Sequence, residues 1–369
     1  MTGQSALALE DGSVFRGRPF GAPVDAEAEV VFNTSMTGYQ EISTDPSYRG
    51  QMVVLTYPLI GNYGVSTDDN ESRRPWIAAF IVREYYADPS NWKAEESLDS
   101  FLVRNGIPGL CEVDTRALVR RLRTRGTMRA VLVNDAAAVP DEQLVERARA
   151  AVALSEKDLV ADASIPESTC WSRGSDTDRP CHVVVVDCGR KENILRSLGR
   201  RGVRVTVVPY LAKVDEIRAL QPDGVVISNG PGDPARLREC ADTVGDLIES
   251  HVPLMGICLG HQLLGLAIGA RTSRLRFGHH GANHPVKDVR TGLVHITSQN
   301  HEFQVDADSI PSDTGFFISQ INLNDGSVEG LAHESLPIFS VQYHPEGSPG
   351  PQDSQYLFDR FIRLCENAL

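Results

Sequence analysis

Residues 252–267 constrain the fold of this chain more than any other segment. Their first part is apolar, the middle reads Gly256-Ile-Cys258-Leu-Gly260, and the last part has the composition of a buried helix. This order predicts a strand, a sharp turn and a helix, because the flanking glycines allow the close backbone approach that such a turn requires. We therefore expect an α/β sheet with Cys258 at a strand-to-helix turn.

The chain divides into parts of different character. Its 369 residues exceed the usual span of one hydrophobic core. Residues 1–155 alternate short β-branched runs with Gly, Asp, Asn and Pro, which predicts a β-rich N-terminal domain. Residues 156–181 lack periodicity and predict a linker. In residues 182–369, apolar runs alternate with helical patterns, which predicts a doubly wound, mostly parallel sheet.

Local patterns place several helices. Asp114 and Thr115 predict the start of a helix over 116–125, and further helices are expected over 141–153 and 192–201. Residues 337–344 read as a strand that ends in a turn stiffened by Pro345. The ends of these helices and strands determine where the polar candidate side chains lie.

Composition excludes some classes of protein. The chain has 36 Lys and Arg against 49 Asp and Glu, a formal charge of -13, which argues against a nucleic-acid binder. Its seven cysteines form no Cys-x-x-Cys pair, which predicts reduced thiols rather than a zinc knuckle or disulfide framework. The N-terminus lacks a secretory pattern, and no run reaches the ~18–20 apolar residues of a membrane span. We expect a soluble, cytoplasmic protein.

Cys258, His344 and Glu346 are the candidate catalytic residues. A helix N-terminus stabilises a thiolate, although a buried cysteine by itself is more often core filling. A thiolate that attacks an acyl group needs an imidazole as acid and base, best oriented by a carboxylate. A His-x-Glu pair by itself is more often a surface hydrogen bond. Combined with the cysteine turn, it predicts a nucleophile, its acid/base and an orienting carboxylate.

A glycine-rich loop follows the apolar run 223–228. It reads Asn229-Gly230-Pro-Gly232-Asp-Pro, and its backbone amides could hold developing negative charge. Such a loop is mostly an ordinary turn. Its place after a parallel strand, where α/β sheets bind ligands, favours a functional interpretation.

These motifs resemble those of the class I, or triad, glutamine amidotransferases: Asn-Gly-Pro-Gly-Asp-Pro, then Gly-Ile-Cys-Leu-Gly-His-Gln, then Tyr-His-Pro-Glu. The first half narrows the resemblance to the small subunit of carbamoyl phosphate synthetase, through Val31-Phe-Asn-Thr-Ser-Met-Thr-Gly-Tyr-Gln-Glu-Ile, Thr44-Asp-Pro-Ser-Tyr and Thr56-Tyr-Pro-Leu-Ile-Gly-Asn. Phe277-Gly-His-His-Gly-Ala-Asn-His-Pro-Val and Gln299-Asn-His also match. The resemblance covers nearly the whole chain.

The resemblance implies roles for further residues. The backbone amides of Leu259 and Gly230 would form an oxyanion hole. The side chains and backbone that hold L-glutamine would come from both domains: Ser47, Gly230, Gly232, Leu259, Gln262, Asn300, Glu302 and Phe303. Glu302 stands where the family often has Gly, so a positive φ there would be strained. Cys188 replaces an expected aromatic residue and reads as a packing substitution.

The resemblance also implies the partner. Ammonia released from glutamine would pass to a carbamoyl phosphate synthetase large subunit, in a heterodimer able to assemble further. ATP and its metal ions would bind there, since this chain has no Walker sequence, and no cofactor is expected in this chain. His279, His280 and His284 form one histidine cluster in an expected loop. They match the amidotransferase sequence, so no metal is expected.

Other interpretations remain open. The chain could serve a different synthetase, such as an anthranilate or guanylate enzyme, although the long N-terminal domain argues against this. It could be a stand-alone γ-glutamyl hydrolase or cysteine peptidase that accepts peptides. It could also be a non-catalytic regulatory subunit, which the complete set of nucleophile, base and orienter disfavours.

Overall fold

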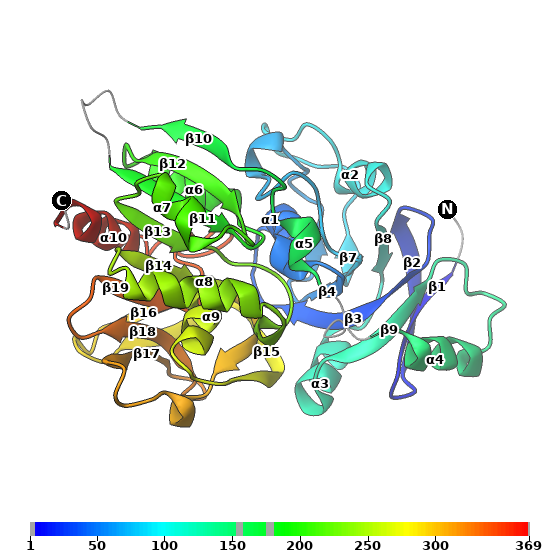
Figure 1. Ribbon diagram of the computed structural model, residues 1–369. Coiled ribbons are helices and arrows are strands. Elements are labelled where there is room, and N and C mark those ends of the chain that lie inside the picture. Colours follow the sequence, from blue (N-terminus) through cyan, green and yellow to red (C-terminus); the bar gives the residue numbers. More distant parts are fainter. Residues whose placement is uncertain (1–3, 153–157, 175–180, 368–369) are drawn as a thin grey trace. The chain divides into compact units, whose positions relative to one another are not determined.

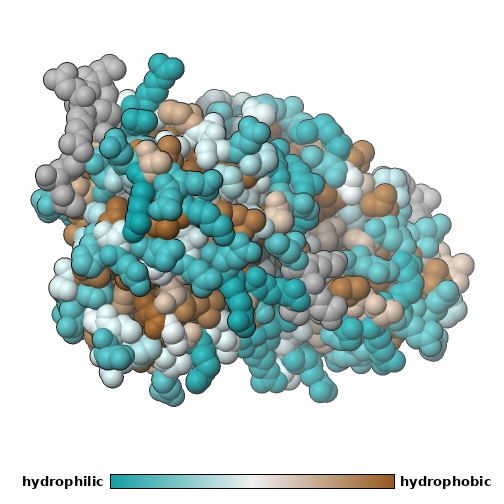
Figure 2. All heavy atoms as spheres, viewed as in Figure 1, coloured by the Kyte–Doolittle hydropathy of each residue, from teal (hydrophilic) through white to brown (hydrophobic). Residues whose placement is uncertain are grey.

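The computed structural model describes residues 4–152, 158–174 and 181–367. The chain forms two compact units, one of residues 1–157 with 276–280, the other of 158–275 with 281–369. Within the described residues, no helix is long and apolar enough to cross a membrane. On the face shown in Figure 2, hydrophilic residues prevail and apolar side chains form small patches between them.

The N-terminal unit is built on a closed barrel with strand order β1-β2-β8-β6-β4-β3-β9. Figure 1 labels all of these strands except β6. Parallel pairing joins β3 to β4, β4 to β6 and β6 to β8, and the other pairs are antiparallel. The strands are β1 (Ser5–Leu9), β2 (Val14–Gly21), β3 (Ala26–Asn33), β4 (Gln51–Leu55), β6 (Ala79–Ile81), β8 (Pro108–Cys111) and β9 (Met128–Val133).

Strand periodicity distributes the barrel side chains among separate cores. On β1, Leu7 and Leu9 pack with α3 (Thr115–Arg125), whereas the alternate residues Ala6 and Ala8 pack with α4 (Asp141–Ala150). A third core joins the strands to α1 (Tyr39–Thr44) and α2 (Leu98–Arg104). Asp114 caps α3 as predicted, because its carboxylate accepts the Ala117 N–H at 2.9 Å. Helix α4 ends at Ala150, and Ala153 lies outside the described residues.

The C-terminal unit is built on a 10-stranded sheet with order β10-β12-β11-β13-β14-β19-β18-β17-β15-β16. From β12 to β19 the neighbours are parallel, as expected from the alternating pattern. An antiparallel extension beyond β19 was not anticipated. The strands are β10 (Thr169–Arg173), β11 (His182–Asp187), β12 (Arg204–Pro209), β13 (Gly224–Ile227), β14 (Leu254–Ile257), β15 (Thr272–Asp288), β16 (Val294–Val305), β17 (Phe316–Asn322), β18 (Val328–His333) and β19 (Ile338–Val341).

Helices cover both faces of the parallel strands (Figure 1). On one face, α7 (Val214–Ala219), α8 (Arg238–Glu249) and α9 (Leu259–Ala267) pack on Val186 and Ile227. On the other, α6 (Glu192–Gly199) and α10 (Tyr356–Asn367) pack on alternate residues such as Val185 and Val226. Each strand is therefore buried on both sides, which explains the continuous apolar runs.

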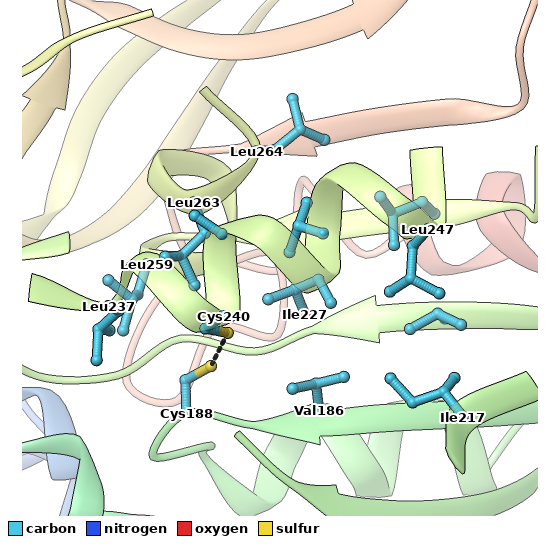
Figure 3. Packing of buried hydrophobic residues seen from close by; sticks show 14 of the residues in the cluster. Val186, Cys188, Ile217, Ile227, Leu237, Cys240, Leu247, Leu259, Leu263 and Leu264 are labelled. Carbon is cyan, nitrogen blue, oxygen red and sulfur yellow. Dashed lines mark hydrogen bonds between the residues drawn. The ribbon is translucent and has the colours of Figure 1, made fainter. Parts of the chain in front are cut away.

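Cys188 belongs to the first of these cores. Its side chain is fully buried, and its sulfur lies 4.0 Å from that of Cys240 on α8 (Figure 3). Leu259 and Leu263 of α9 lie in the same cluster (Figure 3). The surroundings of Cys188 are those of a packing residue.

Two segments differ from the elements that the sequence indicated. The expected linker 156–181 contains α5 (Val160–Ala163) and β10 within its described residues, and β10 pairs with β12. The expected histidine loop is wrong, since His279, His280 and His284 lie in the long strand β15. The strand depends on its pairing with β16 and β17, which the composition of the segment itself does not specify.

Candidate functional site

Three neighbouring parallel strands bring the candidate residues to one sheet edge. In the sheet register, Gly256 of β14 lies opposite both Ile227 of β13 and Ser340 of β19. The glycine-rich loop follows β13, Cys258 follows β14, and residues 342–346 follow β19. Because parallel strands end at the same edge, the topology itself gathers the three motifs.

Cys258 occupies a strained turn between β14 and α9. Its backbone has φ 53° and ψ -102°, a conformation that costs a non-glycine residue about 1–3 kcal/mol. Hydrogen bonds hold it there: the Cys258 N–H donates to the Val341 carbonyl at 2.9 Å, and its own carbonyl accepts from the N–H groups of His261 and Gln262. Strain of this kind is typical of a nucleophile turn.

The glycines around Cys258 are required by close packing. A Cβ on Gly260 would lie 2.2 Å from the Ile227 carbonyl oxygen, and a Cβ on Gly256 would lie 2.7 Å from the Gly260 oxygen. A Cβ on Gly230 would lie 2.0 Å from the Cys188 oxygen. The helix and the glycine-rich loop therefore approach the strands more closely than any side chain permits.

His344 and Glu346 form a buried pair beyond β19. The strand ends at Val341, three residues earlier than predicted, and His344 makes an isolated bridge with Ser298 instead. His344 Nδ1 lies 2.6 Å from Glu346 Oε1, and both side chains are almost fully buried. His344 Nε2 has no hydrogen-bond partner among the described residues, so this nitrogen is the one left for a reacting group.

The charges of this pair support each other. Burial and the charge of Lys191 both lower the pKa of His344. The Glu346 carboxylate and Cys258 raise it by more, so the pKa of His344 rises to about 10. Burial would also raise the pKa of Glu346, but Lys191 and His344 lower it to about 2. At neutral pH the pair is therefore imidazolium and carboxylate.

Lys191 and Asn193 complete the surroundings of Glu346. Lys191 Nζ lies 3.1 Å from Glu346 Oε1 and donates to the Gly347 carbonyl at 2.7 Å, although the side chain is only 2% exposed. Asn193 Nδ2 donates to the Glu346 carbonyl at 2.6 Å. Neither residue was predicted from the sequence. Their position just after β11, at the same sheet edge, was the available signal.

A second histidine beside Cys258 has different surroundings. His261 is completely buried, and burial lowers its pKa to about 3. Its Nδ1 lies 2.9 Å from Ser340 Oγ, and no carboxylate contributes to its pKa. His261 is therefore a neutral histidine of the core, and His344 is the better candidate for acid/base chemistry.

Residues expected to hold glutamine gather partly around β16. Cys258 Sγ lies 3.6 Å from the Asn300 carbonyl oxygen, and Gln262 Nε2 donates to the Phe303 carbonyl at 2.8 Å. Glu302 is not among the described residues with positive φ, so the expected strain is absent, and its carboxylate pairs with Arg274 at 3.1 Å. Gly232 adopts φ +93°.

The remaining predicted positions lie as follows. Leu259 is the first residue of α9, and neither its N–H nor that of Gly230 has an acceptor in the described part of the chain. Ser47 belongs to the N-terminal unit, where Asp45 Oδ1 accepts its N–H at 2.9 Å in a short 3-10 turn, Pro46–Tyr48. Its contact with glutamine stays a prediction.

Comparison with known proteins assigns each half of the chain to a family. Residues 184–364 match the family described as "Glutamine amidotransferase class-I", so the C-terminal unit contains a class I glutamine amidotransferase domain. Residues 7–132 match the family described as "Carbamoyl-phosphate synthase small chain, CPSase domain".

Relatives that match almost the whole chain identify its family. Proteins named "Carbamoyl phosphate synthase small chain" are 51% identical in Methanopyrus kandleri, 48% in Archaeoglobus fulgidus and 49% in Symbiobacterium thermophilum. Each alignment covers 98% of this chain and 98–99% of the relative. The chain belongs to the carbamoyl phosphate synthase small-chain family and is a glutamine-hydrolysing subunit.

Proposed function

We propose that Cys258, His344 and Glu346 hydrolyse glutamine through a covalent thioester, and that the ammonia passes to a carbamoyl phosphate synthase large chain. The observation that carries this proposal is that the two ring nitrogens of His344 have different surroundings. Its Nδ1 is held by Glu346, and its buried Nε2 has no partner in the described residues. An imidazole arranged in this way is oriented for proton transfer.

The first half of the reaction forms the thioester. The Cys258 thiolate attacks the side-chain amide carbon of glutamine, and negative charge collects on the amide oxygen. The N–H groups of Leu259 and Gly230 would bind this oxygen, since both are without an acceptor in the described structure. His344 is cationic at neutral pH, so it donates its Nε2 proton to the departing nitrogen as the C–N bond breaks.

The second half releases glutamate. Neutral His344 removes a proton from water, the hydroxide attacks the thioester carbon, and the C–S bond breaks to regenerate the thiolate and the imidazolium. Glu346 and Lys191 take no part in bond making. Glu346 orients and charges the imidazole, and Lys191 keeps Glu346 ionised.

Substrate binding and assembly are part of the same proposal. Ser47, Gly232, Gln262, Asn300, Glu302 and Phe303 would hold the amino, carboxylate and amide groups of glutamine, which need several separately placed partners. The large chain would bind ATP and its metal ions and use bicarbonate. No cofactor is required in this chain by the chemistry of Cys258 and His344.

The test combines this chain with the candidate large chain, bicarbonate and ATP. With glutamine, Cys258→Ala should lower carbamoyl phosphate formation at least about 10³-fold, because the nucleophile is lost. With ammonium, synthesis should persist. Cys170→Ala removes an exposed thiol and is the matched control. Retained glutamine-dependent synthesis in Cys258→Ala would overturn the mechanism. Glutamine hydrolysis without incorporation would overturn the partner assignment and leave the mechanism intact.

A further inference from the structure

A buried chain of hydrogen bonds runs from β18 to the strand segment beside Cys258. Its members are Glu329 of β18, Gln299 and His301 of β16, and the carbonyl of Phe303. Glu329 is fully buried, and Gln299 and His301 are 1% and 5% exposed. A buried charge is tolerated only where hydrogen bonds and an opposite charge compensate it, so the direction of each bond matters.

Backbone groups and the Glu329 carboxylate together set the orientation of the two amides around Glu329. Asn322 Oδ1 accepts the Asn324 N–H at 2.9 Å, so Asn322 Nδ2 faces Glu329 Oε1 at 2.8 Å. Thr297 Oγ1 donates to the His284 carbonyl, so it accepts from Gln299 Nε2 at 3.1 Å. The same nitrogen donates to Glu329 Oε2 at 2.9 Å. Both oxygens of Glu329 receive N–H donors, as a carboxylate requires.

This orientation determines the protonation of His301. With its nitrogen directed to Glu329, Gln299 presents Oε1 to His301 Nε2 at 3.0 Å. The other ring nitrogen, Nδ1, lies 2.7 Å from the Phe303 carbonyl oxygen. Both neighbours are acceptors, and a neutral imidazole has only one N–H. Only the imidazolium can donate to both.

We propose that Glu329 is a positioning residue that acts through Gln299 to hold His301 as an imidazolium, and thereby fixes residues 300–303 of β16 beside Cys258. His301 and Gln262 both donate to the Phe303 carbonyl, and the Asn300 carbonyl lies 3.6 Å from Cys258 Sγ. The charge on β18 thus sets the geometry of the segment that faces the nucleophile. Its effect on glutamine rests on the function proposed above.

Glu329→Gln tests the proposal with almost no change of shape. A glutamine at 329 presents one nitrogen and one oxygen, so Gln299 can turn its amide over and donate to His301 Nε2, while the Thr297 hydroxyl rotates to donate to Gln299 Oε1. His301 then becomes neutral and keeps its Nδ1–H bond to Phe303. In ¹⁵N-histidine NMR at neutral pH, His301 should show two protonated ring nitrogens in the native chain and one unprotonated nitrogen in the variant. His301→Gln identifies the signals.

Kinetics supply the second readout. In the assembled enzyme, Glu329→Gln should raise KM for glutamine about 10-fold, the loss expected for one charge-assisted hydrogen bond, and change kcat less. Glu334→Gln removes an exposed carboxylate just beyond β18 and should leave both the NMR signals and KM unchanged. Gln299→Met, which removes the relaying amide, should also give a neutral His301 and provides a second variant if Glu329→Gln folds poorly.

The NMR and kinetic results distinguish failure of the Glu329 proposal from failure of the proposed glutamine hydrolysis. An unprotonated His301 nitrogen in the native chain, or an imidazolium that persists in both variants, would overturn the relay whatever the activity. An unchanged KM with the predicted NMR change would overturn the positioning role. Absence of glutamine hydrolysis in the native complex would overturn the proposed function, while the NMR signals would still decide the charge of His301.

Discussion

At the scale of single residues, the site depends on charges that are buried together. Glu346 accepts from His344 and lies 3.1 Å from Lys191 Nζ, and all three side chains are almost completely buried. Each charge would be costly there without the others. The same contacts that compensate burial also hold His344 as the cation that the proposed reaction needs.

The His344–Glu346 pair should make stability depend on pH. The folded chain raises the pKa of His344 from 6.5 to about 10, so the stabilisation is fully present below pH 6.5 and is lost as pH rises toward 10. We expect the difference in unfolding free energy between the native chain and His344→Gln to shrink over this interval. Denaturant titrations at several pH values measure it. A difference in unfolding free energy that stays constant with pH would contradict the prediction. His251→Asn, at an exposed position, is the control and should show no such change with pH.

At the scale of elements, strand ends and helix starts place the chemistry. Helix α9 begins at the nucleophile turn, and its contact with β13 leaves no room for a side chain at Gly260. Helix α8 packs on the same core but contains a glycine, Gly245, with open space around it. A side chain at Gly260 would therefore collide with β13, whereas a side chain at Gly245 would meet no other atom.

Gly260→Ala should destabilise the C-terminal unit by about 3 kcal/mol or more, because the new Cβ would collide with the Ile227 carbonyl and overpack the contact. Gly245→Ala should instead stabilise by about 0.5–1 kcal/mol, the ordinary gain in helix propensity. Thermal unfolding followed by circular dichroism distinguishes them. If both substitutions had the same sign, the close approach of α9 to β13 would not be the cause.

At the scale of the whole molecule, the chain returns to the N-terminal unit after leaving it. Residues 276–280 belong to that unit, although they lie more than a hundred residues beyond its other part. The Arg276 carbonyl accepts the Thr127 N–H at 3.1 Å, and the Phe277 ring stacks on Phe32 with 6.0 Å between centroids. The N-terminal unit is therefore not a continuous stretch of sequence.

Phe277→Ala should lower the stability of the N-terminal unit by about 1–2 kcal/mol, less than a fully buried phenylalanine because the ring is partly exposed. Hydrogen exchange should rise in β3, which carries Phe32. Trp92→Ala, at an 89% exposed position, should change exchange and stability little. Unchanged exchange in β3 after the Phe277 substitution would contradict the role of the returning segment.

The sequence by itself determined the features that depend on near neighbours along the chain. The cap of α3 at Asp114 required only the spacing to Ala117. The alternation of apolar runs and helical patterns predicted the parallel half of the sheet, and the spacing of Gly256, Cys258 and Gly260 predicted the turn. His344 and Glu346 are two residues apart, so their pairing was also within reach of a local pattern.

Tertiary structure alone decided the rest, because the contacts join residues far apart in sequence. Lys191 reaches Glu346 across 155 positions, and no local pattern encodes a buried lysine at that place. In the antiparallel extension, β17 pairs with β15 rather than with β16, which precedes it in sequence. The orientation of Gln299, and with it the charge proposed for His301, depends on Thr297, the His284 carbonyl and Glu329, which only folding brings together. Contacts between residues close in sequence can be predicted from local patterns. The pairing of buried charges from different strands forms only when the sheet forms.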